Sequence, residues 1–175
     1  MLTGARVMAI PLVMLLLAYP GKVTDFLGAL CFGAAGATDF LDGFFARRHQ
    51  LVSRAGKFMD PLADKLLITA ALIMLVASGR VAAWMAMVIV GRELAVTGLR
   101  GLAAADGIIL APDRWGKSKT LLQIVALTAL ILHNSYFGVD FAYLGNVLLW
   151  AALVITLISG VSYFLNFFRK EPEIF

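Results

Sequence analysis

Charged side chains are scarce in this chain. Asp, Glu, Lys and Arg account for 15% of its 175 residues, whereas a soluble domain carries about 25%. Hydrophobic residues make up 61% of the sequence, and the mean hydropathy is +0.89. This composition excludes an ordinary soluble enzyme. It predicts an all-α integral membrane protein in which residues 1–175 form a single transmembrane domain, without a separate soluble part.

Cysteine and histidine are almost absent. Cys31 is the single cysteine, which excludes an intramolecular disulfide. A signal-peptide cleavage motif is also missing: the apolar run after Arg6 continues to Tyr19-Pro20 without the small residues that such a site needs. We therefore interpret this run as a retained first helix.

Apolar segments of membrane-spanning length recur six times, since about 17–25 residues cross a bilayer. Glycine and proline mark the turns between several of them, for example Pro20-Gly21, Ser78-Gly79 and Gly138. The sequence therefore predicts six transmembrane helices, over residues 3–19, 24–47, 56–78, 81–102, 117–134 and 141–168.

Basic residues are distributed unequally between the two ends of these helices. With six spans, 13 of the 15 Lys and Arg residues fall on the side that carries both termini, and only Lys22 and Arg80 fall on the other. Because Lys and Arg gather on the cytoplasmic side of bacterial membrane proteins, both termini should be cytoplasmic. The same face would attract anionic lipids and anionic substrates.

Four aspartates stand within 26 residues of otherwise apolar sequence, and each would cost about 2.5–3.5 kcal/mol at bilayer depth. Asp39 and Asp42 share one helix face, and Asp60 and Asp64 share a face of the next helix. Because the connection between these two helices is short and basic, the helices should pack antiparallel. Their ends would then bring the four carboxylates together. Four close carboxylates need cations. Oxygen ligands, with only His49 nearby in a loop, favour two Mg²⁺ or Mn²⁺ ions over zinc.

Small residues accompany the acids. Gly43 and Ala46 lie one turn apart and would leave a groove for a flat ring, although close helix packing explains Gly43 equally well. For Gly36 and Ala37 we expect helix packing. Arg47 could bind a phosphate bidentately. Two metal ions, an arginine and a carboxylate able to take a proton are typical of a phosphoryl-transfer site.

The combined motif resembles the signature of the CDP-alcohol phosphotransferases, D-x-x-D-G-x-x-A-R, eight residues, then G-x-x-x-D-x-x-x-D. All eight defining positions are present at the family spacing. The resemblance implies a six-helix catalytic domain, usually a homodimer, with its active site open to the cytoplasm. It also implies a role for each signature residue. Asp39, Asp42 and Asp60 would hold a pair of metal ions, and Asp64 would be the general base and a further metal ligand. CDP would bind to Gly43, Ala46, Arg47 and Gly56.

Further segments resemble the bacterial phosphatidylglycerophosphate synthases within this family, among them Asp60 to Leu67, Gly91 to Arg100, Gly116 to Thr120 and Tyr163-Phe164. They imply transfer of the phosphatidyl group of CDP-diacylglycerol to sn-glycerol 3-phosphate, which gives phosphatidylglycerol phosphate and CMP. The glycerol hydroxyl, deprotonated by Asp64, would attack the β-phosphorus with the assistance of the two metal ions. Related synthases often begin with an Asn-Pro-rich stretch before Leu-Thr-x-x-Arg, whereas this sequence opens at Leu2-Thr3-Gly4-Ala5-Arg6.

The acceptor is a dianion and needs a basic pocket. Candidate phosphate ligands stand at the cytoplasmic ends of the fourth and fifth helices, although anchoring at the membrane surface explains them about as well. Glu93 should hold the adjacent Arg92 in place rather than perform chemistry. The candidates are Arg92, Arg100, Lys117 and Lys119.

Two alternatives remain open. One is a family member with another acceptor, namely a cardiolipin, phosphatidylserine or phosphatidylinositol-phosphate synthase. The other is a cation transporter that uses the acidic cluster as an ion site. The transporter would leave the arginine, the glycines and the fixed spacing unused, and no polar relay leads towards the opposite end. Release of CMP discriminates directly between a transferase and a transporter.

Overall fold

Six helices make up most of the part of the chain that the structure describes. The computed structural model describes the backbone of residues 2–49, 54–105, 115–136 and 138–170, and the side chains of residues 6–38, 62–104, 119–136 and 138–167. The helices are α1 (Leu2–Ala18), α2 (Lys22–His49), α3 (Arg54–Ala77), α4 (Ala83–Ala105), α5 (Trp115–Leu132) and α6 (Phe141–Lys170). The six predicted helices are confirmed, and their ends agree within a few residues with the predicted ranges.

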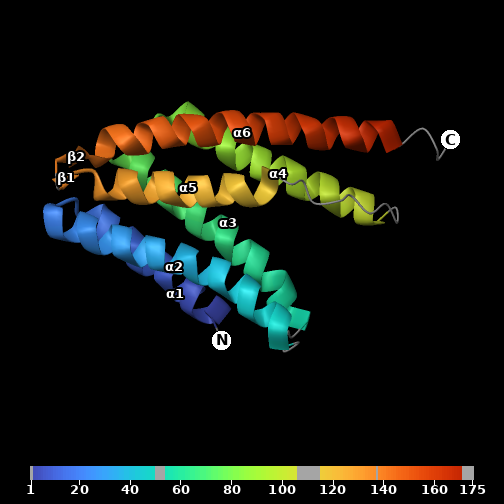
Figure 1. Cartoon of the computed structure of the whole chain (residues 1–175), viewed down its shortest axis with the longest axis horizontal. Helices are drawn as coiled ribbons and strands as arrows, with labels where there is room; N and C mark the ends of the chain where they lie inside the picture. Colours follow the sequence, from blue (N-terminus) through green and yellow to red (C-terminus); the bar gives the residue numbers. More distant parts are fainter. Residues whose placement is uncertain (1, 50–53, 106–114, 137, 171–175) are drawn as a thin grey trace.

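The helices alternate in direction, so that chain-order neighbours run oppositely (Figure 1). One end of the bundle collects the start of α1, the end of α2, the start of α3, the end of α4, the start of α5 and the end of α6. We call it the signature end, because the segments of α2 and α3 that carry the acidic motif are there. The opposite end, which we call the closed end, holds the α3–α4 turn and a short hairpin.

Specific backbone features form the turns of the closed end. Gly79 has φ +72° between α3 and α4, and Gly138 has φ +78°, in the left-handed region that glycine adopts without strain. Strands β1 (Ser135–Tyr136) and β2 (Val139–Asp140) pair antiparallel there, an element that the sequence did not predict. The Asp140 side chain then accepts a hydrogen bond from the Tyr143 backbone N–H at 3.1 Å and caps α6.

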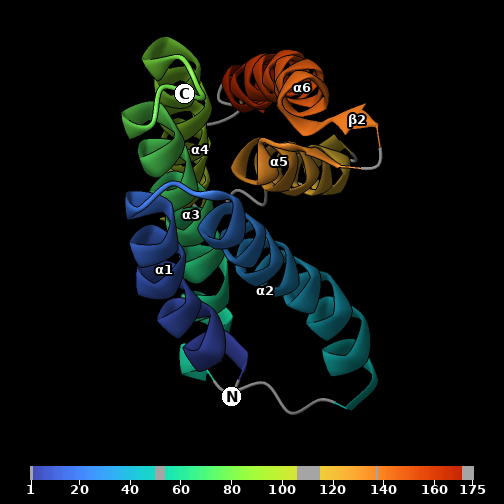
Figure 2. The same ribbon diagram turned by 90° about the vertical axis from the view of Figure 1, so that its left-hand side faces the viewer.

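Packing groups the helices unequally. Helix α5 lies along α6, α4 also contacts α6, and α1 packs against both α2 and α3 (Figure 2). Within the described residues, direct contact between α2 and α3 is small. We expected α2 and α3 to pack closely on each other. In the described residues, each of them packs against α1 instead.

Glycines allow the closest helix approaches. A methyl group at Gly36 of α2 would lie 2.8 Å from a side-chain carbon of Ile124 in α5, so the predicted packing role of Gly36 is confirmed. Ala37 is exposed instead, and its predicted packing role finds no support in this chain. At the closed end, a methyl group at Gly145 would lie 2.9 Å from the backbone nitrogen of Leu130, which brings α6 close to α5.

Two apolar clusters form the interior. The larger joins buried residues of all six helices, including Val13, Phe32, Leu72, Leu127 and Leu149, and extends towards the closed end. The smaller joins α4 and α6 on the other side and contains Val96, Leu99, Ala103, Tyr163 and Phe167.

One helix is long and apolar enough to cross a membrane among the residues that the structure describes, namely α6 over Phe141–Phe167, with a window hydropathy of 2.1. Two shorter apolar stretches, Arg6–Ala18 and Lys119–Leu132, fall in α1 and α5.

Candidate active site

Seven of the eight signature residues lie outside the described side chains, although all eight belong to helices. Asp39, Asp42, Gly43, Ala46 and Arg47 fall in the last third of α2, and Gly56 and Asp60 fall in the first turns of α3. The side chain of Asp64 is described. The expected meeting of the four carboxylates therefore remains a prediction, supported so far by the position of both helix segments at the signature end (Figure 1).

Asp64 forms an ion pair that the sequence did not predict. Its Oδ1 lies 2.9 Å from Nη1 of Arg6 in α1. The arginine side chain is 3% exposed, whereas the aspartate side chain is 28% exposed. A buried guanidinium thus holds a carboxylate that is itself partly exposed, as a group that reacts with a bound molecule must be.

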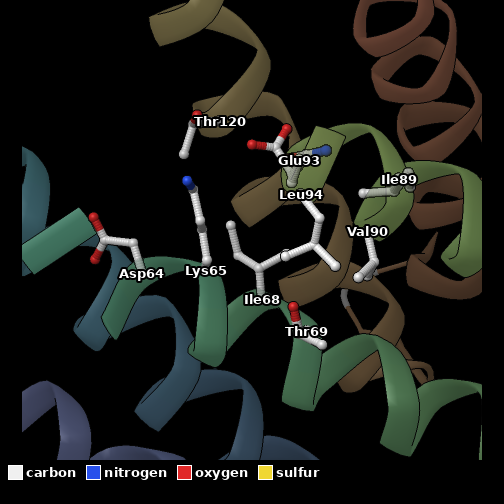
Figure 3. A pocket seen from close by; sticks show the side chains of 10 residues that line it. Asp64, Lys65, Ile68, Thr69, Ile89, Val90, Glu93, Leu94 and Thr120 are labelled. Atoms are coloured by element: carbon white, nitrogen blue, oxygen red, sulfur yellow. The ribbon is translucent and has the colours of Figure 1, made fainter. Parts of the chain in front are cut away.

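A pocket of about 180 Å³ opens beside Asp64, between α3, α4 and α5 (Figure 3). Its polar lining residues are Asp64, Lys65, Glu93 and Thr120 near the signature end, together with Thr69 and Gln123. Its apolar lining residues are Ile68, Ile89, Val90 and Leu94. The pocket suits a small molecule with a charged or hydroxylated part near Asp64.

A layer of buried and partly buried polar residues adjoins this pocket and lies between the two apolar clusters. Burying such groups in a membrane bundle is costly, so they mark a functional site or a necessary structural contact. We call this set the polar layer: Arg92, Glu93, Lys119, Gln123, Thr156 and Ser159.

Glu93 is the centre of the polar layer. Its Oε1 accepts from Nη1 of Arg92 at 2.9 Å and also pairs with Nζ of Lys119. Nη2 of Arg92 donates to the Ser159 hydroxyl at 2.6 Å, and its guanidinium lies 5.9 Å from the Tyr163 ring centroid. The expected role of Glu93 in holding Arg92 is confirmed.

The four basic residues expected to bind the acceptor phosphate thus differ in their surroundings. Arg92 and Lys119 are held by Glu93 in the polar layer. Arg100 is exposed. The side chain of Lys117 lies outside the described part, although its backbone belongs to the first turn of α5.

From the sequence, Lys65 was one of the basic residues of the predicted cytoplasmic face and part of the Asp60 to Leu67 segment, without an assigned role of its own. In the structure it lines the pocket, and its Nζ donates to the hydroxyl of Thr97, which in turn donates to the backbone carbonyl of Glu93 at 2.6 Å. Its position directly after Asp64 is the signal in the sequence that could have placed it in the site.

Family comparison identifies the chemistry of this arrangement. The family model for CDP-alcohol phosphatidyltransferase matches residues 1–158. The chain belongs to the CDP-alcohol phosphatidyltransferase family. It is accordingly a phosphatidyltransferase, and family membership decides against the cation-transporter alternative. Family membership and the apolar helix α6 together identify this chain as a membrane protein.

Several bacteria have proteins that are similar to this chain over most of its length. The chain is 43% identical over 175 residues to a CDP-diacylglycerol–glycerol-3-phosphate 3-phosphatidyltransferase of Bacillus subtilis, with 93% of this chain and 91% of that protein covered. It is 41% identical to a protein of the same name from Rickettsia typhi, with 93% and 92% covered. A probable phosphatidylglycerophosphate synthase of Mycobacterium tuberculosis is 36% identical, with 93% and 77% covered.

Proposed function

We propose that this phosphatidyltransferase moves the phosphatidyl group of CDP-diacylglycerol to sn-glycerol 3-phosphate, releasing CMP and forming phosphatidylglycerol phosphate. The observation that carries the choice of acceptor is the pocket beside Asp64, which is lined by Lys65 and by Glu93, the residue that pairs with Arg92 and Lys119. An acceptor with a hydroxyl and a phosphate fits such a pocket. The names of the similar proteins support the same reaction.

Asp39, Asp42, Asp60 and Asp64 would hold two divalent cations, Mg²⁺ or Mn²⁺. Asp64 fits this role, because its carboxylate is partly exposed at the pocket and offers the oxygen ligands that these ions prefer. Within the described residues no three acidic, histidine or cysteine side chains come together, since the other three aspartates lie outside them. When bound, the ions would neutralise the diphosphate and stabilise the leaving CMP.

Asp64 is also the proposed general base. Arg6 holds its Oδ1 at 2.9 Å, and the partly exposed carboxylate lines the pocket, where it would accept the proton of the acceptor hydroxyl. The hydroxyl oxygen then attacks the β-phosphorus, the bond between that phosphorus and the CMP oxygen breaks, and the proton stays on the Asp64 carboxyl. The apolar residues Ile68, Ile89, Val90 and Leu94 of the pocket would limit the water that competes as acceptor.

The CDP part of the donor would bind to Gly43, Ala46, Arg47 and Gly56. Gly43 follows Gly36 by seven residues, and this spacing puts both on the same face of α2. Gly36 faces α5. The proposed nucleotide groove would therefore face the start of α5, which also borders the pocket through Thr120.

The acceptor phosphate would lie among the basic residues of α4 and α5, with Arg92, Arg100, Lys117 and Lys119 as candidates. Arg92 and Lys119 have the surroundings that favour this role, because they lie in the polar layer that adjoins the pocket. Arg100 is exposed and is the weaker candidate on position.

The proposed setting is the bacterial cytoplasmic membrane. Residues 1–175 would form one catalytic domain with six transmembrane helices, and both termini and the active site would face the cytoplasm. The excess of Lys and Arg at the signature end supports this orientation. A homodimer is the assembly that the resemblance to the family implies.

Release of CMP from CDP-diacylglycerol by the purified protein tests the proposal. The assay compares sn-glycerol 3-phosphate with serine, inositol phosphate and phosphatidylglycerol, each with Mg²⁺ or Mn²⁺ and after chelation. We expect release that requires both the metal ion and sn-glycerol 3-phosphate, with phosphatidylglycerol phosphate as the lipid product. Release with a different acceptor alone would keep the transferase and replace the substrate. Release that survives complete chelation would contradict the metal assignment.

A further inference from the structure

We propose that Lys65 binds the phosphate of the acceptor, while Glu93 holds Arg92 and Lys119 and so sets the charge of the pocket. The inference rests on the proposed function and adds to it a binding residue and a reason for the acceptor class. That class is a small alcohol that carries a phosphomonoester dianion.

The position of Lys65 is the first argument. Asp64 and Lys65 are consecutive in α3, and both line the same pocket (Figure 3). The lysine side chain extends towards the part of the pocket that Glu93 and Thr120 border. A molecule whose hydroxyl lies at Asp64 can therefore bring a phosphate a few atoms away to the Lys65 ammonium. In sn-glycerol 3-phosphate, the reacting hydroxyl and the phosphate are on the two ends of a three-carbon chain.

The partners of the basic residues are the second argument. Arg92 and Lys119 each pair with the Glu93 carboxylate, and Arg92 also bonds to Ser159. Lys65 donates to the neutral hydroxyl of Thr97, and within the described residues no carboxylate lies at ion-pair distance from it. An arriving phosphate thus gains a charge-assisted contact from Lys65 without displacing a carboxylate.

The charge balance is the third argument. Among the described residues, Arg92 and Lys119 pair with the Glu93 carboxylate and Lys65 lines the same pocket, so these three cations exceed that one carboxylate by two positive charges. The Arg6–Asp64 pair adds no net charge. A phosphomonoester dianion neutralises this excess, whereas zwitterionic serine does not. The pocket therefore favours phosphorylated acceptors over serine.

Kinetics of Lys65→Gln test the assignment, with Lys22→Gln as the matched control, because Lys22 is an exposed lysine at the closed end. We expect the KM for sn-glycerol 3-phosphate to rise by about tenfold or more in Lys65→Gln, since hydrogen bonds to charged groups contribute about 1.5–3 kcal/mol. The KM for CDP-diacylglycerol should stay within about twofold of the wild type, and Lys65→Arg should recover most of the loss. Lys22→Gln should change neither constant.

Inorganic phosphate gives a second readout that does not depend on the acceptor hydroxyl. It should inhibit the wild type competitively against sn-glycerol 3-phosphate, and its inhibition constant should rise in Lys65→Gln by about the same factor as the KM. Thr97→Val provides a milder variant in case Lys65→Gln does not fold. It removes the hydroxyl that holds the lysine, and it should raise the acceptor KM by about two- to fivefold.

Specific outcomes overturn the inference. An unchanged acceptor KM in Lys65→Gln, or an equal rise in the KM of both substrates, would show that Lys65 does not bind the acceptor phosphate. The proposed function fails separately, when the wild type releases no CMP with sn-glycerol 3-phosphate. An active wild type with an unaffected Lys65→Gln variant would overturn this inference and leave the proposed function in place.

Discussion

The two ends of the bundle each contain a buried arginine that pairs with an aspartate, but the two pairs differ in how much of the acid is accessible. At the closed end, Nη2 of Arg80 lies 2.8 Å from Oδ2 of Asp25, its Nη1 donates to the backbone carbonyl of Ile131 at 2.9 Å, and both side chains are less than a tenth exposed. At the signature end Arg6 is equally buried, but Asp64 is 28% exposed.

This difference separates a structural pair from a functional one. The Asp25–Arg80 pair joins the start of α2 to the α3–α4 turn and to the end of α5, so both charges are used in holding helices together. Asp64 is partly exposed and lines a pocket, where a bound molecule can reach it. Arginine–aspartate pairing alone therefore does not indicate function, whereas a partly exposed acid beside a pocket does.

The largest effect is expected on activity, from Asp64→Asn. Loss of a general base reduces rates by about 10²–10⁴-fold, so CMP release should fall by that factor. Stability should change less than in the closed-end variants, because the asparagine oxygen can still accept a hydrogen bond from Arg6 and the site is partly exposed. Thermal unfolding of the same preparation provides the comparison. A loss of activity below tenfold would remove Asp64 as the base.

The closed-end pair should show the opposite pattern. Arg80→Ala leaves the Asp25 carboxylate buried without its partner, which should lower the free energy of unfolding by about 3–5 kcal/mol. The activity per folded molecule should stay near that of the wild type. Removing both charges in Asp25→Asn with Arg80→Leu should recover part of the stability. Full stability of Arg80→Ala in denaturant titrations would contradict a structural role of the pair.

A smaller loss of stability is expected from Gly145→Ala at the closed end. The added methyl group would lie 2.9 Å from the Leu130 backbone nitrogen, which cannot move without shifting α5. Overpacking of this kind costs about 1–3 kcal/mol. Gly101→Ala in α4 is the matched control, since a methyl group there meets nothing within 4 Å and should stabilise the helix by up to about 1 kcal/mol. Equal melting temperatures for the two variants would contradict the difference in packing.

The smallest effect is expected from Gly160→Ala, in α6 beside the polar layer. Here the new methyl group would lie 3.0 Å from Cγ of Arg92, a flexible side chain that can move. Stability should therefore change by less than about 1 kcal/mol. The moved guanidinium should raise the KM for the acceptor by about two- to fivefold. A change in the KM for CDP-diacylglycerol alone would contradict the placement of Arg92 on the acceptor side.

The sequence predicted the helices well, because hydropathy and turn residues determine where each span begins and ends. It also predicted the contact between Glu93 and Arg92, which are neighbours in the chain and lie at one level of the bundle. The acidic motif was identified for the same reason, since its spacing is local. The positions of its carboxylates relative to one another remain a prediction.

Contacts between distant helices were not predicted. Arg6 and Asp64 come from α1 and α3, and Asp25 and Arg80 from α2 and the turn after α3. Such pairs depend on the rotation and crossing of helices, which residue spacing within one helix does not determine. The position of α1 against both α2 and α3 illustrates this, because the short basic connection between the two signature helices suggested that they pack on each other directly.

The apolar cluster between the pocket and the closed end has a consequence for the membrane as an electrical barrier. Beyond the pocket, α3 continues with Ala71, Leu72 and Leu75, all at most 1% exposed, before the Asp25–Arg80 pair is reached. In the proposed transmembrane setting, ions and protons that enter with charged substrates would meet this apolar barrier and would have to leave on the side from which they came. In that setting the enzyme would process highly charged molecules at the bilayer without letting ions cross down the membrane potential.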